Sequence, residues 1–351
     1  MIALWIGLYL VVAFVVVMLS IQISKYVDLL DKKTTLSGGF IGGVFLAAVT
    51  SLPEVFTSIS ALFIIPGEAS SSMVIGNILG SDLFNAFVLA LTFMFTFHHL
   101  KSKKVGRTHI VSSITLVIFY ALVAYATLAP ASWQIIIGIK IGSSAFPEGA
   151  GINVISILLL VIYAISVKFM AAPEEEDEKE EDTSPLTVKQ IVVRFIIFSI
   201  LLIGASIGIT YITDIVAEGL QLGKTFAGAL FLGVATSLPE VSATISLCKL
   251  GNTDAAVGNI VGSNTFNFLI LVASDLISWN NPVYCYNTQS MLLIVLGAIS
   301  AIAMAAFICH KVLKKYPEGQ EMKTVTKVLY WVALSVIVIA YILFIILSNV
   351  L

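Results

Sequence analysis

The chain has 351 residues, of which 58% are hydrophobic and only 11% are charged. A soluble globular domain carries about 25% charged residues, so this composition excludes an ordinary soluble protein. The formal net charge of −2 identifies no partner, because in a membrane protein the charges are divided between two faces of the membrane, and no nucleic-acid partner is expected.

Ten apolar runs are each long enough, at about 20 residues, to cross a bilayer as a helix. They lie near residues 2–23, 39–64, 72–97, 110–128, 151–170, 190–212, 225–247, 256–278, 290–309 and 327–349. The first run begins at Met1 without a preceding basic segment or a clear small-residue cleavage site, which favours a first span over a removed signal peptide. We therefore predict an all-α integral membrane protein with ten transmembrane helices.

Lysine and arginine residues indicate which side of the membrane each loop occupies, because they are enriched in cytoplasmic loops. They cluster after the first, third and ninth runs, near residues 25–33, 101–107 and 311–315. With ten spans, all three clusters are cytoplasmic if both termini lie outside. Short loops and the lack of a targeting segment indicate a prokaryotic cytoplasmic membrane.

Two motifs in the second and third spans return in the seventh and eighth. "TSLPEV" occupies residues 50–55 and 236–241, and "GNILGSDLFN" at residues 76–85 matches "GNIVGSNTFN" at residues 258–267. The chain therefore consists of two related halves. Since each half holds five spans, an odd number, the second half is inverted relative to the first, as in secondary transporters with inverted repeats.

An acidic segment joins the halves. The sequence "PEEEDEKEEDTSP" at residues 173–185 is typical of a solvated, disordered connector, and a weak collector of divalent cations is the alternative interpretation. The predicted organisation is a first five-helix repeat at residues 1–172, an acidic cytoplasmic linker at 173–187, and a second, inverted repeat at 188–351.

Glu54 and Glu240 lie near the middle of spans two and seven. A carboxylate at the centre of a membrane helix costs about 2.5–3.5 kcal/mol on insertion scales, so such residues usually mark an ion or substrate path. Pro53 and Pro239 stand directly before them. Because proline lacks an amide hydrogen, each frees a backbone carbonyl that can coordinate a cation, as in the broken helices of transporters.

Oxygen-bearing side chains share the helix faces of both motifs, given 3.6 residues per turn. Besides the two glutamates they are Thr50, Ser51, Thr57, Ser58, Asn77, Ser81, Asp82 and Asn85 in the first half and Thr236, Ser237, Thr244, Asn259, Ser263, Asn264 and Asn267 in the second. The cluster contains neither His nor Cys, and all-oxygen sets bind hard cations such as calcium. The alternative is that the Ser, Thr and Asn residues only join helices, and that spaced glycines such as Gly76 and Gly80 only allow close packing.

We expect no catalytic residues and no cofactor in this protein. Its expected partners are metal cations, as transported substrates, and the lipid bilayer. The sequence predicts one metal-cation site. Its members are Glu54, Glu240, Asp82, Thr50, Ser51, Thr236, Ser237, Asn77, Ser81, Asn259, Ser263 and Asn264. Three other acidic residues, Asp214, Glu218 and Asp275, stand near outer helix ends and are expected at the membrane interface.

At these motifs the chain resembles the calcium/cation antiporter superfamily and, within it, the sodium/calcium exchanger family. The resemblance implies ten helices in two inverted halves, with spans 2, 3, 7 and 8 as a core and spans 1 and 6 as a sliding pair. It further implies that Glu54 and Glu240 bind both calcium and the counter-ion. Further oxygen ligands, from carbonyl or hydroxyl groups, would come from Thr50, Ser51, Thr236 and Ser237.

The predicted function is alternating-access exchange of Ca²⁺ for Na⁺. An antiporter of H⁺ against Ca²⁺ or another divalent cation, and a K⁺-dependent Na⁺/Ca²⁺ exchanger, are the alternatives. The proton-coupled branch usually carries "GN" followed by "E" where this chain has "TSLPE". An intramembrane enzyme is disfavoured because the repeated motif is symmetric, whereas acid–base catalysis needs differently tuned groups. A channel or a cation-sensing receptor forms a third class, of which the receptor is the less favoured.

The charge of Asp82 decides the exchange ratio. If all three acids are ionised, three Na⁺ neutralise the pocket and one Ca²⁺ leaves it at −1, so each cycle moves one charge, worth about 2.3 kcal/mol at 100 mV. If Asp82 is protonated, the pocket carries a charge of −2, and a different ratio of Na⁺ to Ca²⁺ is expected. The coupling ion, the stoichiometry, the choice of divalent cation and the oligomeric state remain open at this stage.

Overall fold

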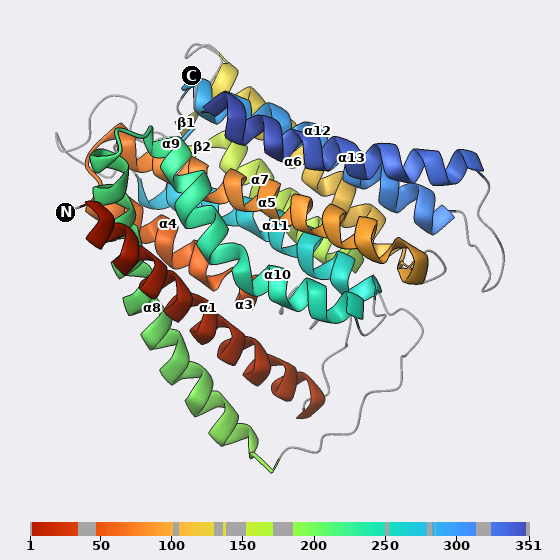
Figure 1. The fold of residues 1–351 in the computed structure, drawn as a ribbon, viewed down its shortest axis with the longest axis horizontal. Helices are drawn as coiled ribbons and strands as arrows, with labels where there is room; N and C mark the ends of the chain where they lie inside the picture. The colour runs from red at the N-terminus through yellow and green to blue at the C-terminus, as the bar shows by residue number, and fades with distance from the viewer. Residues whose placement is uncertain are drawn as a thin grey trace.

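The computed structural model describes residues 2–33, 47–100, 105–129, 136–137, 152–170, 185–249, 253–278, 283–284, 286–313 and 324–348. Within them the chain is almost entirely helical (Figure 1). The first half contains α1 (Ile2–Lys33), α3 (Ala47–Thr50), α4 (Leu52–Ile64), α5 (Glu68–Leu100), α6 (Thr108–Leu128) and α7 (Val154–Met170). The second contains α8 (Val188–Gly219), α9 (Lys224–Ala227), the π-helical segment η3 (Gly228–Leu232), α10 (Gly233–Lys249), α11 (Thr253–Ile277), α12 (Thr288–Leu313) and α13 (Thr324–Ser348).

The described helices confirm the predicted fold class. Eight of them are long and apolar enough to cross a membrane, and the shorter apolar helices Leu52–Ile64 and Val154–Phe169 occupy the positions of the second and fifth predicted spans. A two-stranded antiparallel ladder, β1 (Ile136–Ile137) with β2 (Ile152–Asn153), precedes α7. The molecule is therefore an all-α, multi-pass membrane protein of ten spans in two inverted halves.

Helices α1 and α8 lie side by side at one edge of the molecule (Figure 1). Trp5 packs against Tyr211 and Tyr26 against Phe198, so the two helices run antiparallel. This arrangement is expected for the first spans of inverted halves. Thr187 and Gln190 form a capping box at the start of α8, which satisfies backbone N–H groups at this helix end.

The centre of the protein is built from α4 and α5 of the first half and α10 and α11 of the second, which pack against one another. Helices α6, α7, α12 and α13 cover the side of this centre opposite α1 and α8 (Figure 1). Each half thus contributes the same pair of spans, its second and third, to the centre. The two copies of the repeated motifs meet there.

Glycines allow α5 to approach α9 and η3 at backbone distance. A Cβ atom added at Gly76 would lie 2.1 Å from the carbonyl oxygen of Thr225, and one at Gly80 would lie 2.4 Å from Cα of Ala229. From the other side, a Cβ at Gly228 would lie 2.4 Å from the carbonyl oxygen of Met73. The predicted packing role of Gly76 and Gly80 is therefore confirmed.

The two halves interrupt their motif helices differently. In the first half the break falls at Ser51, between α3 and α4, and Pro53 lies in the first turn of α4. In the second half the matching Ser237 and Pro239 lie inside the continuous α10, and the π-helical segment η3 ends directly before it, at a position whose first-half counterpart lies outside the described residues. Short π-helical segments are frequent at functional sites.

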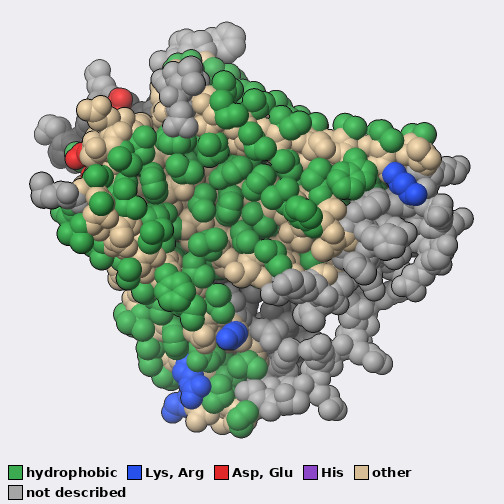
Figure 2. All heavy atoms as spheres, viewed as in Figure 1, with side chains coloured by type: hydrophobic (Ala, Val, Ile, Leu, Met, Phe, Trp, Pro, Cys, Tyr) green, Lys and Arg blue, Asp and Glu red, His purple; other side chains and the backbone are tan. Residues whose placement is uncertain are grey.

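The lipid-facing surface agrees with this architecture. Figure 2 shows a face covered mostly by hydrophobic side chains, with Lys and Arg side chains toward the ends where α8 and α13 begin. Asp and Glu side chains appear at the opposite end of the same view. Lys224 of α9 forms ion pairs with Asp214 and Glu218 of α8 at this end. The Asp214 side chain is 19% exposed and the Glu218 side chain is 70% exposed.

Asp275 lies two residues before the end of α11, near a helix end as expected, and only 4% of its surface is exposed. Its Oδ2 accepts hydrogen bonds from the backbone N–H of Asn153 at 2.9 Å and from the hydroxyl of Ser156 at 2.7 Å. Asp275 thus holds Asn153, whose own Oδ1 accepts a hydrogen bond from the backbone N–H of Ile155 at 2.9 Å in the first turn of α7.

Candidate cation site

The two glutamates lie at the centre of the protein, on α4 and α10, and both are fully buried. Glu54 Oε1 accepts hydrogen bonds from the hydroxyls of Ser81 at 3.2 Å and Ser237 at 3.3 Å. Glu240 Oε1 accepts one from the hydroxyl of Ser51 at 3.4 Å. Each glutamate is therefore bound by a serine from the other half of the chain.

The remaining hydroxyls of the motifs link the four central helices. Ser81 Oγ lies 2.5 Å from Ser237 Oγ, and Thr50 Oγ1 lies 3.3 Å from Ser263 Oγ. Thr236 instead donates to the carbonyl oxygen of Leu232, in η3, at 2.9 Å. Both pairs of hydroxyls join residues from different halves. The two motifs thus form one polar cluster.

Asn77 and Asn259 have equivalent contacts in the two halves. The Asn77 amide donates to the hydroxyls of Thr57 at 3.0 Å and Ser58 at 2.9 Å, and to the carbonyl oxygen of Glu54 at 3.4 Å. The Asn259 amide donates to the carbonyl oxygen of Glu240 and to the Thr244 hydroxyl, both at 3.1 Å. In both cases the amide nitrogen is fully engaged with the neighbouring helix. The amide oxygen is left for another partner.

Six buried acceptor oxygens in this region have no hydrogen-bond donor among the described residues. They are Oε2 of Glu54 and Glu240, and Oδ1 of Asn77, Asn85, Asn259 and Asn267. Buried polar atoms normally have partners, so a group of unpaired acceptors needs an explanation. Carboxylate and amide oxygens can only accept hydrogen bonds, and a cation satisfies them without a donor.

Asp82 is buried beside the cluster but has different partners. Its Oδ1 accepts from the Asn267 amide at 2.8 Å, and its Oδ2 accepts from the Tyr120 hydroxyl at 3.4 Å. The Asn264 amide donates to the Asp82 carbonyl oxygen at 2.9 Å. The same Asn267 amide also reaches the hydroxyl of Ser81 at 3.3 Å, which is the link between Asp82 and the glutamates.

All twelve predicted site residues are thus buried at the centre of the protein. Glu54 and Glu240 each accept a hydrogen bond from a serine of the opposite motif, and Asp82 is joined to Glu54 through Asn267 and Ser81. Tyr120, on α6, escaped the sequence analysis because its span carries neither of the repeated motifs. Only a packing argument reaches it, since a tyrosine hydroxyl in an apolar core needs a polar partner.

The comparisons with known proteins fit this geometry. The family model described as "Sodium/calcium exchanger protein" matches residues 4–172 and 190–350. The inner membrane protein YrbG of Escherichia coli K12 is 25% identical over 248 residues, which cover 66% of this chain and 67% of YrbG.

Two solved structures show the same fold. The H⁺/Ca²⁺ exchanger CAX superposes with a TM-score of 0.65 at 14% identity, over 98% of this chain and 88% of that one. A structure of the sodium-calcium exchanger NCX_Mj superposes with a TM-score of 0.55 at 19% identity, over 98% of this chain and 99% of that one. At these identities the likeness concerns the fold alone, and it spans both halves.

Proposed function

The chain belongs to the sodium/calcium exchanger protein family, and we propose that it exchanges Ca²⁺ for Na⁺ across the membrane, with Glu54 and Glu240 forming one shared cation site. When both are ionised, the pair carries two negative charges, which one calcium ion balances. Sodium competes for the same carboxylates. Competition for one site makes transport of either ion depend on release of the other.

The unpaired oxygens carry this proposal. Oε2 of Glu54 and of Glu240 are buried and have no donor among the described residues. Calcium takes six to eight oxygen ligands in flexible geometry, and the surrounding amide and hydroxyl oxygens are ligands of this kind. A cation bound there would offset the cost of two buried carboxylates.

Alternating access needs a part of the protein that moves past the site. The site residues come from α3, α4, α5, α10 and α11, whereas α1 and α8 contribute none of them. Two hydroxyls of these helices donate to backbone carbonyls of the neighbouring elements in the described part of the chain. The Tyr9 hydroxyl donates to the Phe231 carbonyl oxygen at 2.5 Å, and the Thr210 hydroxyl donates to that of Thr57 at 3.4 Å. We propose that α1 and α8 slide as a pair to expose the site to either side.

Proton coupling is the second candidate. The solved structure named as an H⁺/Ca²⁺ exchanger has the same fold, and a carboxylate that binds sodium can also bind a proton. A K⁺-dependent exchange is the third candidate. All three use the same two glutamates, so the driving ion has to be measured.

We further propose that the protein resides in a prokaryotic cytoplasmic membrane with both termini outside. One of the relatives, YrbG of Escherichia coli, is named as an inner membrane protein. The Lys and Arg side chains toward the starts of α8 and α13 (Figure 2) then face the cytoplasm.

Uptake of ⁴⁵Ca²⁺ into proteoliposomes tests the function. Vesicles loaded with Na⁺ are diluted into Na⁺-free buffer, and parallel vesicles carry an acid-inside proton gradient. We expect uptake with the sodium gradient alone, and its loss in Glu54→Gln and in Glu240→Gln. Glu68→Gln is the matched control, because Glu68 is exposed at the start of α5, and it should transport normally.

Each result separates the candidates. Uptake driven only by protons would replace sodium with H⁺ as the counter-ion and leave the site assignment intact. Uptake that requires K⁺ together with Na⁺ would establish the third candidate. Absence of coupled uptake under every gradient would contradict the antiporter proposal itself.

A further inference from the structure

Three buried hydroxyls form a stripe along one face of α8. Ser206, Thr210 and Thr213 are each 0% exposed, although most residues of this span are not buried in the protein. At about 100° per residue, the three positions fall within about 60° of one another around the helix. They extend over about 10 Å along its axis. The stripe is therefore a row of oxygen atoms on a helix that the proposed function sets in motion.

Thr210 shows which neighbour the stripe faces. Its hydroxyl donates to the carbonyl oxygen of Thr57 on α4 at 3.4 Å and to that of Ser206 in its own helix at 2.8 Å. The Thr57 hydroxyl accepts a hydrogen bond from the Asn77 amide at 3.0 Å, and the same amide reaches the carbonyl oxygen of Glu54 at 3.4 Å. The stripe therefore lies against residues that hold the candidate cation site.

Helices α4 and α8 end on the same side of the molecule. Helix α8 ends close to Lys224, which pairs with Asp214 in the last turns of α8. Helix α4 ends just before α5, and Ser72 near the start of α5 is joined through Asn287 to Thr225, the residue after Lys224. This side is the outer side in the proposed topology.

The stripe thus runs from the outer half of the membrane inward to the site. Ser206 stands four residues before Thr210, much as Glu54 stands three residues before Thr57. Because α4 and α8 run in the same direction, Ser206 lies at about the depth of Glu54. Thr213 lies about one turn nearer the outer surface than Thr210.

Two of the three hydroxyls are unsatisfied. Ser206 Oγ and Thr213 Oγ1 have no hydrogen-bond partner among the described residues. A hydroxyl in a membrane helix usually bonds to a neighbouring helix or to the preceding turn. Ser199 of α8 does the latter, donating to the carbonyl oxygen of Phe195 at 2.9 Å. Since an unpaired buried polar group is disfavoured, Ser206 and Thr213 are expected to gain partners in another state of the protein.

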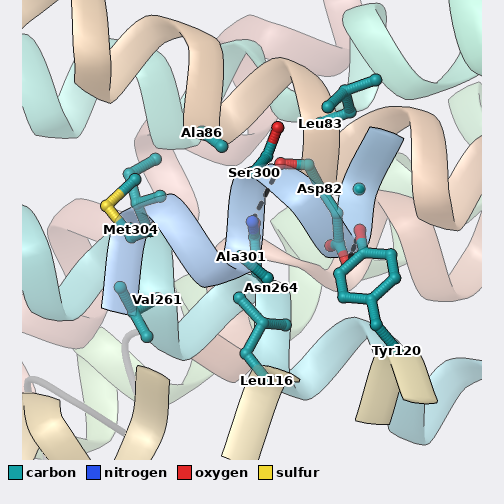
Figure 3. A pocket seen from close by; sticks show the side chains of 12 residues that line it. Asp82, Leu83, Ala86, Leu116, Tyr120, Val261, Asn264, Ser300, Ala301 and Met304 are labelled. Carbon is teal, nitrogen blue, oxygen red and sulfur yellow. Dashed lines mark hydrogen bonds between the residues drawn. The ribbon is translucent and has the colours of Figure 1, made fainter. Parts of the chain in front are cut away.

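Ser300 illustrates a different explanation for an unpartnered hydroxyl. It borders a small cavity beside Asp82 (Figure 3), whose volume of about 10 Å³ is close to the room that one water molecule needs. One water molecule there accounts for the Ser300 hydroxyl. Ser206 and Thr213 instead lie on the face of α8 that packs against α4.

Helix α1, the other member of the moving pair, lacks such a row in the part whose burial is described. Its buried residues there include the apolar Ala13, Val16 and Ile23. The Tyr9 hydroxyl already donates to the carbonyl oxygen of Phe231 at 2.5 Å. The unpaired oxygens of the moving pair are therefore on α8.

We propose that Ser206, Thr210 and Thr213 line the route by which hard cations pass between the outer solution and the Glu54–Glu240 site. A cation that leaves water exchanges its water ligands for protein oxygens, and a row of hydroxyls supplies these in steps. Sliding of α8 against α4 breaks the long Thr210–Thr57 bond and frees the third hydroxyl. The inference rests on the proposed exchange function, because it uses the same site and the same moving helices.

Transport, binding and stability measured in one variant test the proposal. Ser206→Ala/Thr213→Val removes the two unpaired hydroxyls and nearly preserves the side-chain shapes. Since both hydroxyls are buried without partners, the melting temperature of the purified chain should not fall. Equilibrium ⁴⁵Ca²⁺ binding should be unchanged. Initial ⁴⁵Ca²⁺ uptake into proteoliposomes, under the gradient that drives the native chain, should fall about tenfold or more. Ser199→Ala is the matched control on the same helix and should keep the native rate.

Introduced cysteines locate the route without a transport measurement, and they decide the test if the double variant does not fold. In a chain whose three native cysteines are replaced, a small positively charged thiol reagent added to intact cells should modify Thr213→Cys and Ser206→Cys. Ser274→Cys is the control and should stay unmodified. Ser274 is also 0% exposed and has an unpaired hydroxyl, but it lies on α11, which packs against α5 and α10.

The outcomes separate this proposal from the exchange function. A native chain without coupled uptake contradicts the exchange function, whereas the cysteine reactions still report on the route. A native uptake rate in the double variant would overturn the route. So would a loss of ⁴⁵Ca²⁺ binding as large as the loss of uptake, or the failure of either cysteine to react.

Discussion

At the scale of single residues, the site depends on contacts across the two halves. Ser51 of the first motif bonds to Glu240, and Ser237 of the second bonds to Glu54. Helical spacing correctly predicted that these side chains share buried faces with the glutamates. It could not predict the exchange of partners, because that depends on how α4 and α10 pack against each other.

Ser237→Ala removes one of the two hydroxyls that donate to Glu54 Oε1. A hydrogen bond to a charged group contributes about 1.5–3 kcal/mol, so we expect the calcium affinity to fall about tenfold or more. The measurement is the Ca²⁺ concentration that gives half-maximal uptake in proteoliposomes. Ser60→Ala is the control, since Ser60 bonds only to the carbonyl oxygen of Phe56 in its own helix. Equal shifts in both variants would contradict a specific role for Ser237.

At the scale of helices, the sequence predicted the spans better than their irregular turns. Pro53 and Pro239 stand in identical motifs, yet the first half breaks at Ser51 whereas α10 is continuous through the matching Ser237. Gly228, in η3, and Gly233, at the start of α10, let this stretch lie against the backbone of α5, a contact between the halves that helical spacing alone does not predict.

The orientation of α8 tests the proposed topology. It is an uninterrupted helix of 32 residues, and Lys189 near its start and Gln221 just beyond its end are both exposed. In a chain lacking Cys248, Cys285 and Cys309, a membrane-impermeant maleimide added to intact cells should label Gln221→Cys. It should label Lys189→Cys only after permeabilisation, because that end is expected in the cytoplasm. The opposite pattern would reverse the assigned orientation.

At the scale of the whole molecule, composition and the repeated motifs were sufficient to predict the fold class, the inverted halves and the family, all of which are confirmed. The membrane imposes this regularity, because backbone groups in lipid must pair within helices. The connection of Asp82 to Tyr120 could not be predicted, since it depends on the side of α5 that meets α6 and α12. The domain boundaries and the role of the acidic linker stay predictions.

Counting calcium ions bound to the purified chain tests the central claim most directly. If Glu54 and Glu240 form one shared site, equilibrium binding of ⁴⁵Ca²⁺ should give about one ion per chain. Either Glu54→Gln or Glu240→Gln alone should then weaken that binding by at least about a hundredfold. Removing one partner of a buried pair of opposite charges costs about 3–5 kcal/mol. Two calcium ions per chain, with each variant losing only one, would show that the glutamates form separate sites and would contradict this account.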